Sequence, residues 1–217
     1  MSDTADTAET ATEDVITVFS DYVCPFCYLG RESLRQYQAT RGEPLRIDWR
    51  PFDLRSGKRN PDGSIDHSVD DGKDEDYFEQ AKENVRRLQE EYGVEMNLEL
   101  SRETDSLPAQ IVSVHLQETT DYNTWLAFDE GVFEALWTDG RDIGDTDVLV
   151  DVAEEAGVDG ASVREALDDE ELRERVRDQF TDAQQAGVTG VPTFVYDGHA
   201  ARGAVPPEQL ERLVEGA

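Results

Sequence analysis

The two cysteines of this 217-residue chain, Cys24 and Cys27, stand three positions apart in the sequence Cys-Pro-Phe-Cys. They follow an apolar run over residues 15–19 and open a segment of helical character over residues 28–39. The first turn of a helix has unpaired N–H groups and the positive end of the helix dipole, and both stabilise a thiolate. Residues three apart share one face of a helix, so the pair can close a short disulfide. The spacing therefore predicts thiol–disulfide chemistry.

Three other interpretations of the cysteine pair are weaker. Burial as small hydrophobic residues does not explain their spacing or their position between a strand and a helix. A zinc site needs four ligands, but the chain has no second C-x-x-C and its three histidines lack ligand-pair spacing. A structural disulfide across so short a loop would remove little entropy from the unfolded chain. Pro25 also suits the first turn of a helix, where its missing N–H costs nothing.

The chain is strongly acidic, with 50 acidic against 20 basic residues and a net charge of −30. This balance argues against binding to nucleic acid or to anionic membranes. The acidic residues are spread along the whole chain and lysine is scarce, a composition that resembles proteins of salt-loving archaea. Screening over about 3 Å at 1 M salt makes such self-repulsion tolerable. A partner with a basic surface is the alternative explanation.

The N-terminal residues 1–14 are acidic and have neither a basic region nor an apolar segment. This composition predicts a disordered tail rather than a secretory signal. No apolar stretch approaches the roughly 20 residues of a membrane span. We therefore expect a cytoplasmic protein, and in that compartment a lone C-x-x-C is more often catalytic or metal-binding than structural.

Hydrophobic periodicity predicts a strand–helix–strand unit, then a helical block, then two strands and a helix. The first strand covers residues 15–19, and residues 45–49 alternate as a second strand that should run parallel to it. Residues 54–74 are rich in glycine, proline and charge, which predicts a surface loop. Apolar faces mark six helical segments: residues 77–92, 107–114, 125–137, 148–156, a short one around 167 that Asp159 could cap, and 172–183.

The C-terminal part changes character at Gly187. Residues 193–196 are strand-like, and Asp197-Gly198 is a two-residue hairpin signal before a partner strand over residues 199–204. Two prolines then open a last helix. The aromatic residues of the helical block are expected to form a helix–helix core.

Four short stretches match motifs of one family: residues 20–30 (SDYVCPFCYLG), 49–52 (WRPF), 140–145 (GRDIGD) and 187–194 (GVTGVPTF). With the order of elements, the chain resembles the DsbA family and, more narrowly, its cytoplasmic FrnE-like subgroup. The resemblance implies an α/β thioredoxin-like fold (βαβ…ββα) with a large inserted all-helical domain. It divides the chain into the acidic tail (1–14), a thioredoxin-like domain (15–56 and 187–217) and a helical insert with its leading loop (57–186).

The resemblance also implies roles for particular residues. Cys24 would be the nucleophile and Cys27 would resolve the mixed disulfide. Pro192 would be cis and face the disulfide, so that the Val191 backbone could pair with an extended substrate. The catalytic set is then Cys24, Cys27 and Pro192, and the substrate-binding set is Pro25, Phe26, Val191 and Thr193.

Two features depart from the family pattern. Asp105 and Gln110 stand where some relatives carry Asn and His. Phe26 stands where periplasmic members often place His, whose positive charge would stabilise the thiolate. We therefore expect the Cys24–Cys27 redox couple to be less strongly oxidising than that of the periplasmic members.

The sequence thus predicts a thiol–disulfide oxidoreductase that acts on protein or small-molecule thiols and disulfides. No metal, nucleotide or flavin is implied, and the oligomeric state, monomer or homodimer, is left open. One alternative is a glutathione-dependent isomerase or kappa-type transferase on the same fold. Such enzymes usually carry serine at the helix N-terminus, so the retained Cys27 argues against them. The other alternative is a non-enzymatic module that binds a partner or a metal through the helical domain.

Overall fold

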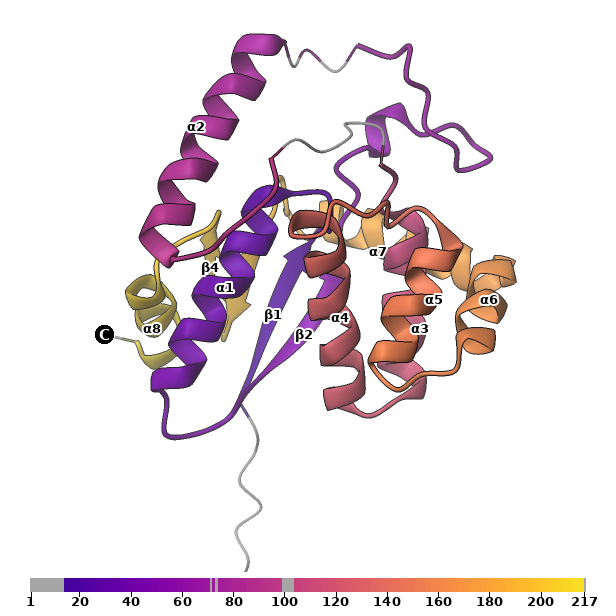
Figure 1. Ribbon diagram of the computed structural model, residues 1–217. Coiled ribbons are helices and arrows are strands. Elements are labelled where there is room, and N and C mark those ends of the chain that lie inside the picture. Colours follow the sequence, from indigo (N-terminus) through magenta and orange to yellow (C-terminus); the bar gives the residue numbers. More distant parts are fainter. Residues whose placement is uncertain (1–13, 71, 73, 99–103, 217) are drawn as a thin grey trace, which may run out of the picture.

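A four-stranded sheet with the strand order β2-β1-β3-β4 organises the protein (Figure 1). β1 (Asp14–Ser20) runs parallel to β2 (Leu45–Pro51) and antiparallel to β3 (Thr193–Tyr196), which pairs with β4 (His199–Arg202) in an antiparallel hairpin. The sheet therefore has the parallel first pair and the C-terminal hairpin expected from the sequence. The computed structural model describes residues 14–70, 72, 74–98 and 104–216.

Two strand boundaries differ from expectation. β1 is one residue longer at each end, so Asp14 belongs to the strand and not to the tail. The predicted disorder of residues 1–13 lies outside the described residues. β4 ends at Arg202, two residues early, because Gly203 adopts a left-handed φ of 86° and turns the chain. The Gly203 N–H then donates to the Pro192 carbonyl oxygen at 2.8 Å, which ties the end of β4 to the loop before β3.

The helices follow the predicted order. α1 (Pro25–Thr40) joins β1 to β2, and α8 (Pro207–Glu215) ends the chain. α1 begins at Pro25, three residues earlier than the periodicity indicated, because proline is accommodated in the first turn. Between β2 and β3 the described chain contains η1 (Ser56–Lys58), α2 (Glu75–Tyr92), α3 (Leu107–Thr119), α4 (Tyr122–Trp137), α5 (Thr146–Glu155), α6 (Gly160–Asp168) and α7 (Glu170–Gln185).

Aspartate side chains fix where many of these helices begin. Each accepts a hydrogen bond from a backbone N–H of the first turn, which would otherwise have no partner. The predicted cap of the short α6 is confirmed, because Asp159 accepts from the Ala161 N–H. The aspartate caps precede α2, α4, α5, α6 and α7 and are Asp74, Asp121, Asp145, Asp159 and Asp169.

Helices cover both faces of the sheet. In Figure 1, α1 lies beside β1 and in front of β4, and the fainter α7 lies farther back. Phe194 of β3 points toward α1, whereas Phe19 of β1 packs on the opposite face with Ala183 of α7. The parallel strands are therefore buried on both sides near their carboxyl ends, where β1 leads into α1.

An aromatic cluster joins the sheet to the helical block. Tyr22, just after β1, stacks on Trp49 of β2 at a ring-centroid distance of 5.4 Å and meets the edge of Phe133 of α4 at 4.8 Å. The Trp137 indole N–H donates to the Tyr22 carbonyl oxygen at 2.8 Å. The aromatic residues of α4 thus form core, as expected, and they hold the turn that precedes Cys24.

The loop after β2 is more ordered than a plain surface loop. It contains η1, and an isolated bridge joins Arg59 to Ile65. The Arg59 side chain is only 7% exposed. Periodicity could not show this, because the loop is held by polar contacts and not by an apolar face.

None of the described helices is both long and apolar enough to cross a membrane.

Candidate active site

Cys24 stands at the N-terminus of α1, as the sequence predicts. Its backbone is extended, and its carbonyl oxygen accepts from the Cys27 N–H at 3.0 Å and from the Tyr28 N–H at 3.4 Å. Both cysteines are free thiols, 5% and 2% exposed. Cys27 therefore lies one turn into the helix and deeper than Cys24.

The loop before β3 meets the cysteines from the other side. The Cys24 thiol lies against the Val191 carbonyl oxygen, with 3.6 Å between Sγ and O. The Val191–Pro192 peptide bond is cis, as the resemblance implies. A β-carbon on Gly30 would lie 2.9 Å from Pro192 Cγ, so α1 can approach this loop so closely only with glycine there. The structure thus brings Cys24, Cys27 and Pro192 together.

The four residues expected to bind substrate differ in how they lie around Cys24 and Cys27. Pro25, Phe26 and Val191 are half-buried, and Phe26 and Val191 pack against the same apolar cluster as Cys24. Thr193 is 2% exposed, and its hydroxyl donates to the Gly190 carbonyl oxygen at 2.7 Å. The Thr193 side chain therefore supports the loop, while the other three are partly exposed near the thiol. Their role in substrate binding stays a prediction.

Burial distinguishes the two thiols. It raises the pKa of the Cys27 thiol well above its usual value, and the neighbouring Cys24 raises it further. The Ser20 hydroxyl and the Asp21 backbone N–H act on Cys27 in the opposite direction. At neutral pH Cys27 is therefore a protonated thiol that already has two donors placed to stabilise its thiolate.

A buried carboxyl group lies directly beneath the motif. Burial raises the pKa of Asp21 to about 6, against the effect of the hydrogen bonds that it accepts. The backbone N–H groups of Val23 and Leu54 donate to it at 3.2 and 2.9 Å, and Ser106 Oγ donates at 2.5 Å. Gln110 Nε2 is a fourth donor at 3.4 Å. Asp21 thereby joins the turn before Cys24, the loop after β2 and the start of α3.

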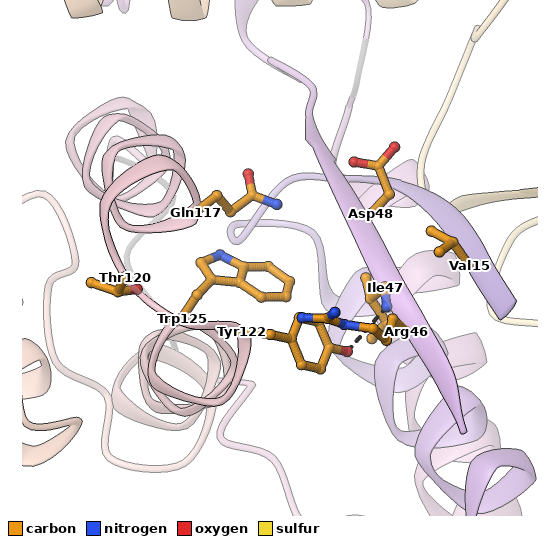
Figure 2. Close-up of a pocket in the computed structure, with 8 residues that line it drawn as sticks. All are labelled: Val15, Arg46, Ile47, Asp48, Gln117, Thr120, Tyr122 and Trp125. Carbon is orange, nitrogen blue, oxygen red and sulfur yellow. Dashed lines mark hydrogen bonds between the residues drawn. The ribbon is translucent and has the colours of Figure 1, made fainter. Parts of the chain in front are cut away.

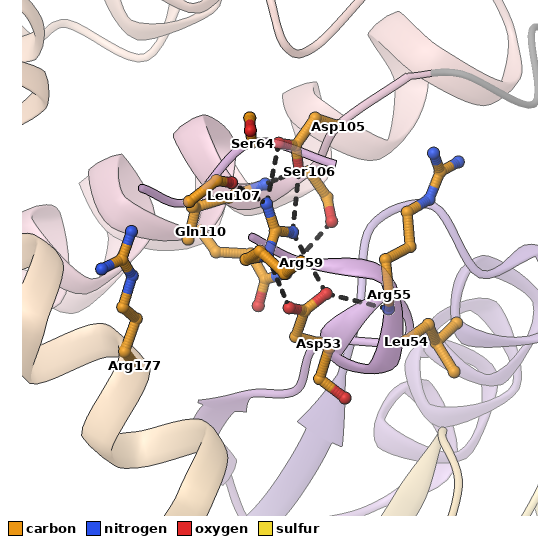
Figure 3. A network of polar contacts seen from close by, with 12 residues as sticks. Asp53, Leu54, Arg55, Arg59, Ser64, Asp105, Ser106, Leu107, Gln110 and Arg177 are labelled. Atoms are coloured by element: carbon orange, nitrogen blue, oxygen red, sulfur yellow. Dashed lines mark hydrogen bonds and ion pairs between the residues drawn. The ribbon is translucent and has the colours of Figure 1, made fainter. Parts of the chain in front are cut away.

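A second polar network supports the loop after β2 (Figure 3). Arg59 donates to Asp53 at 2.7 Å, to Asp105 at 2.9 Å and to the Gly63 carbonyl oxygen at 2.7 Å. Asp105 and Gln110, which differ from some relatives, therefore bind protein groups in this chain: Asp105 holds Arg59 and Gln110 holds Asp21. Sequence reasoning assigned no role to Asp21 or Arg59, and only the position of Asp21 within the motif stretch could have indicated one.

The other side of the turn is held by Tyr22. Its hydroxyl donates to Asp129 at 3.0 Å and accepts from the Ser113 hydroxyl at 2.9 Å, and Asp129 also pairs with Arg31 of α1 at 3.0 Å. Burial raises the pKa of Asp129, and Arg31 opposes this effect. Truncating one partner of such a buried pair typically destabilises a protein by about 3–5 kcal/mol. The segment leading to Cys24 is thus fixed on both sides by buried polar groups.

The structure also has a cavity of about 410 Å³ that contains neither cysteine (Figure 2). It lies between β2, at the edge of the sheet, and the corner where α3 leads into α4. The Tyr122 hydroxyl accepts from the Ile47 N–H at 3.0 Å, and Arg46 stacks over the Tyr122 ring. The lining residues are Val15, Arg46, Ile47, Asp48, Gln117, Thr120, Tyr122 and Trp125. None of them belongs to the predicted site.

The titration of Asp21 makes stability depend on pH. Because its pKa is about 6 in the folded chain and 3.8 in the reference state, folding favours the protonated carboxyl. This contribution is complete below pH 3.8 and is lost as the pH rises through 6. The unfolding free energy of Asp21→Asn relative to the wild type should therefore rise by about 2 kcal/mol from pH 4 to pH 8.

Chemical denaturation at a fixed salt concentration, repeated across this pH range, measures the difference. Asp139→Asn serves as the control, because Asp139 is exposed. It should leave the pH dependence of the unfolding free energy unchanged. If plots of unfolding free energy against pH run parallel for the wild type and Asp21→Asn, Asp21 does not titrate in this range.

Comparison with known proteins agrees with the geometry. The model of the DSBA-like thioredoxin domain family matches residues 15–215. The "Uncharacterized protein YwbO" of Bacillus subtilis (strain 168) is 30% identical over 200 residues, which cover 92% of this chain and 94% of that protein. The chain therefore belongs to the DSBA-like thioredoxin domain family.

Two solved structures extend the comparison. A probable DsbA oxidoreductase, SCO1869 from Streptomyces coelicolor, superposes with a TM-score of 0.75 at 23% identity, covering 93% of this chain and 88% of that one. The cytosolic disulfide reductase DsbM from Pseudomonas aeruginosa, solved with GSH, has a TM-score of 0.61 at 18% identity, with 92% of each chain covered. At these identities the likeness shows the shared thioredoxin fold.

Proposed function

We propose that this protein is a thiol–disulfide oxidoreductase in which Cys24 is the nucleophile and Cys27 the resolving thiol. The observation that carries the proposal is the asymmetry of the pair. Cys24 immediately precedes α1 and its Sγ lies 3.6 Å from Val191 O, whereas Cys27 is more deeply buried and its pKa is raised. The cis Pro192 beside them completes the set of residues that the family resemblance assigns to catalysis.

The reaction has two steps. The Cys24 thiolate attacks one sulfur of the substrate disulfide, forms a mixed disulfide and releases the other sulfur, which takes up a proton. Cys27 then loses its proton, attacks Cys24 Sγ and displaces the second substrate sulfur. The substrate gains two electrons and two protons, and the two cysteines become a disulfide. The reverse sequence oxidises a dithiol.

The surroundings of Cys27 fit this order of events. A protonated Cys27 does not compete with Cys24 for the substrate in the first step. When it ionises in the second step, the Ser20 hydroxyl and the Asp21 N–H can stabilise its thiolate. The burial that raises the pKa of Cys27 therefore separates the two roles.

The finer assignment is also a proposal. We place the protein in the FrnE-like subgroup because of the four motif stretches, and in a salt-rich cytoplasm because of its net charge of −30. We further divide the chain into a thioredoxin-like domain (15–56 and 187–217) and a helical insert (57–186). The insert would complete the site, since Ser106 and Gln110 of this segment bind Asp21.

Reduction of insulin by dithiothreitol tests the activity. The wild type should accelerate it, and a protein without disulfide exchange would not. The assay also separates the main alternative, because a glutathione-dependent isomerase or transferase would not accelerate insulin reduction.

A substitution at Phe26 is expected to change the reduction potential of the Cys24–Cys27 pair. It is half-buried between Pro25 and Cys27, so Phe26→His would place a partial positive charge beside the Cys24 thiolate. Stabilising the reduced form makes a dithiol more oxidising. We expect the reduction potential, measured against glutathione, to rise by roughly 30 mV, a tenfold change in the equilibrium constant. Phe26→Leu is the uncharged control, and an unchanged or more negative potential in Phe26→His would contradict the prediction.

A further inference from the structure

Arginines that lack a carboxylate partner are notable in a chain with 50 acidic and 20 basic residues. Many arginines of the described segments pair with Asp or Glu, as Arg59 does with Asp53. Arg55 is an exception among the described residues, since no ion pair joins its guanidinium to any of their carboxylates. Its backbone N–H donates to Asp53 at 2.9 Å, but its side chain points away from Asp53 and Arg59 (Figure 3).

The segment that leads to Arg55 lies beside the turn before Cys24. The Phe52 N–H donates to the Ser20 carbonyl oxygen at 2.9 Å, and the Leu54 N–H donates to the Asp21 carboxylate at 2.9 Å. The chain before Arg55 therefore runs next to the residues that lead to Cys24. Leu54 packs into the same apolar cluster as Val191, whose carbonyl oxygen touches the Cys24 thiol.

A second arginine without a described carboxylate partner flanks the loop that carries Pro192. Arg202 pairs with Thr193 in the sheet, and its guanidinium donates to the Gly187 carbonyl oxygen at 3.4 Å. On the other side, Ser56 lies 3.5 Å from Gln184, near the end of α7, so the loop of Arg55 reaches the same segment. The segment that carries Arg55 and the side chain of Arg202 therefore both adjoin residues 184–187, which lead into the cis-proline loop of a strongly negative protein.

We propose that Arg55, with Arg202 in a supporting role, binds carboxylates next to the substrate sulfur, so that the site selects acidic disulfides. The assignment rests on the proposed oxidoreductase function. A protein with a net charge of −30 repels an anionic substrate, and a guanidinium close to the cysteine pair would offset that repulsion where the reaction takes place. Arginine also binds carboxylates through two parallel hydrogen bonds, which orients the substrate. The carboxylates could belong to a tripeptide such as glutathione or to an acidic stretch of a protein.

The test compares acidic and neutral substrates in matched variants. The substrates are glutathione disulfide, a peptide disulfide flanked by glutamates and the neutral hydroxyethyl disulfide. The variants are Arg55→Gln, Arg55→Lys and Arg86→Gln. Arg86 is an exposed arginine of α2 that likewise has no ion pair with a described carboxylate, so it serves as the control. All assays use one salt concentration at which circular dichroism shows every variant to be folded.

We expect Arg55→Gln to lower kcat/KM about tenfold for the acidic disulfides, mainly through KM, and less than twofold for hydroxyethyl disulfide. Arg55→Lys should recover part of the loss, and Arg86→Gln should behave as the wild type. A loss confined to glutathione disulfide, or to the glutamate peptide, would identify which source of carboxylates the site prefers.

Equal losses with acidic and neutral substrates would overturn the proposal, because they would indicate a structural role. Unchanged kinetics in Arg55→Gln would overturn it as well. If the wild type exchanges none of the three disulfides, the proposed function itself fails, which is a different result.

Discussion

Cys24→Ser is expected to abolish disulfide exchange, with a loss of roughly three orders of magnitude or more in the rate of insulin reduction. Serine at the helix N-terminus cannot provide a thiolate, and the remaining Cys27 is 2% exposed and protonated at neutral pH. Cys27→Ser should behave differently. Its Cys24 can still attack a disulfide, but no second thiol is available to release the product.

The difference between the variants is best measured on the intermediate. After incubation with a disulfide substrate and alkylation of free thiols, mass spectrometry should find a persistent mixed disulfide in Cys27→Ser. The double variant without cysteines is the control and should form none. Reductase turnover by Cys24→Ser at the wild-type rate would contradict the assignment of the nucleophile.

The cysteine pair at the start of α1 could be predicted from the sequence because it depends on local features. A strand, a C-x-x-C pair and a proline in the first turn stand within 14 residues of one another, and each has a strong local preference. The same is true of the hairpin at Asp197-Gly198 and of the Asp159 cap, which also lie where they were expected. The position of Pro192 opposite the cysteines required the family resemblance, since 165 residues separate it from Cys27.

The buried polar groups beneath the site could not be predicted in this way. Asp21 and Asp129 are two of 50 acidic residues, and only the position of Asp21 beside the cysteine motif hints at a role. Their donors come from distant segments, such as Ser106 for Asp21 and Arg31 for Asp129. Apolar periodicity identifies which face of a helix is buried, but it does not identify a carboxyl group that is buried with hydrogen bonds.

The fold is expected to need salt, which is the second large effect. The 20 basic residues cannot neutralise 50 acidic ones, and many of the described ion pairs are exposed, such as Arg164 with Asp147. Exposed pairs contribute only about 0–1 kcal/mol each, whereas total stability is typically about 5–15 kcal/mol. The Debye length is about 30 Å at 0.01 M salt and about 3 Å at 1 M, so repulsion acts across the whole molecule only in dilute buffer.

Dialysis from molar to millimolar KCl at neutral pH should therefore abolish the helical circular dichroism signal and lower the unfolding temperature. The buried pairs, such as Arg31 with Asp129, are shielded from solvent and cannot provide the salt dependence, so the effect should arise from the acidic surface. Sucrose at matched osmolality is the control and should not replace KCl, and reduction of the cysteines should matter less than the salt. If the protein unfolds at the same temperature in both buffers, its charge is not an adaptation to salt. The acidic surface would then be better explained by a partner with a basic surface.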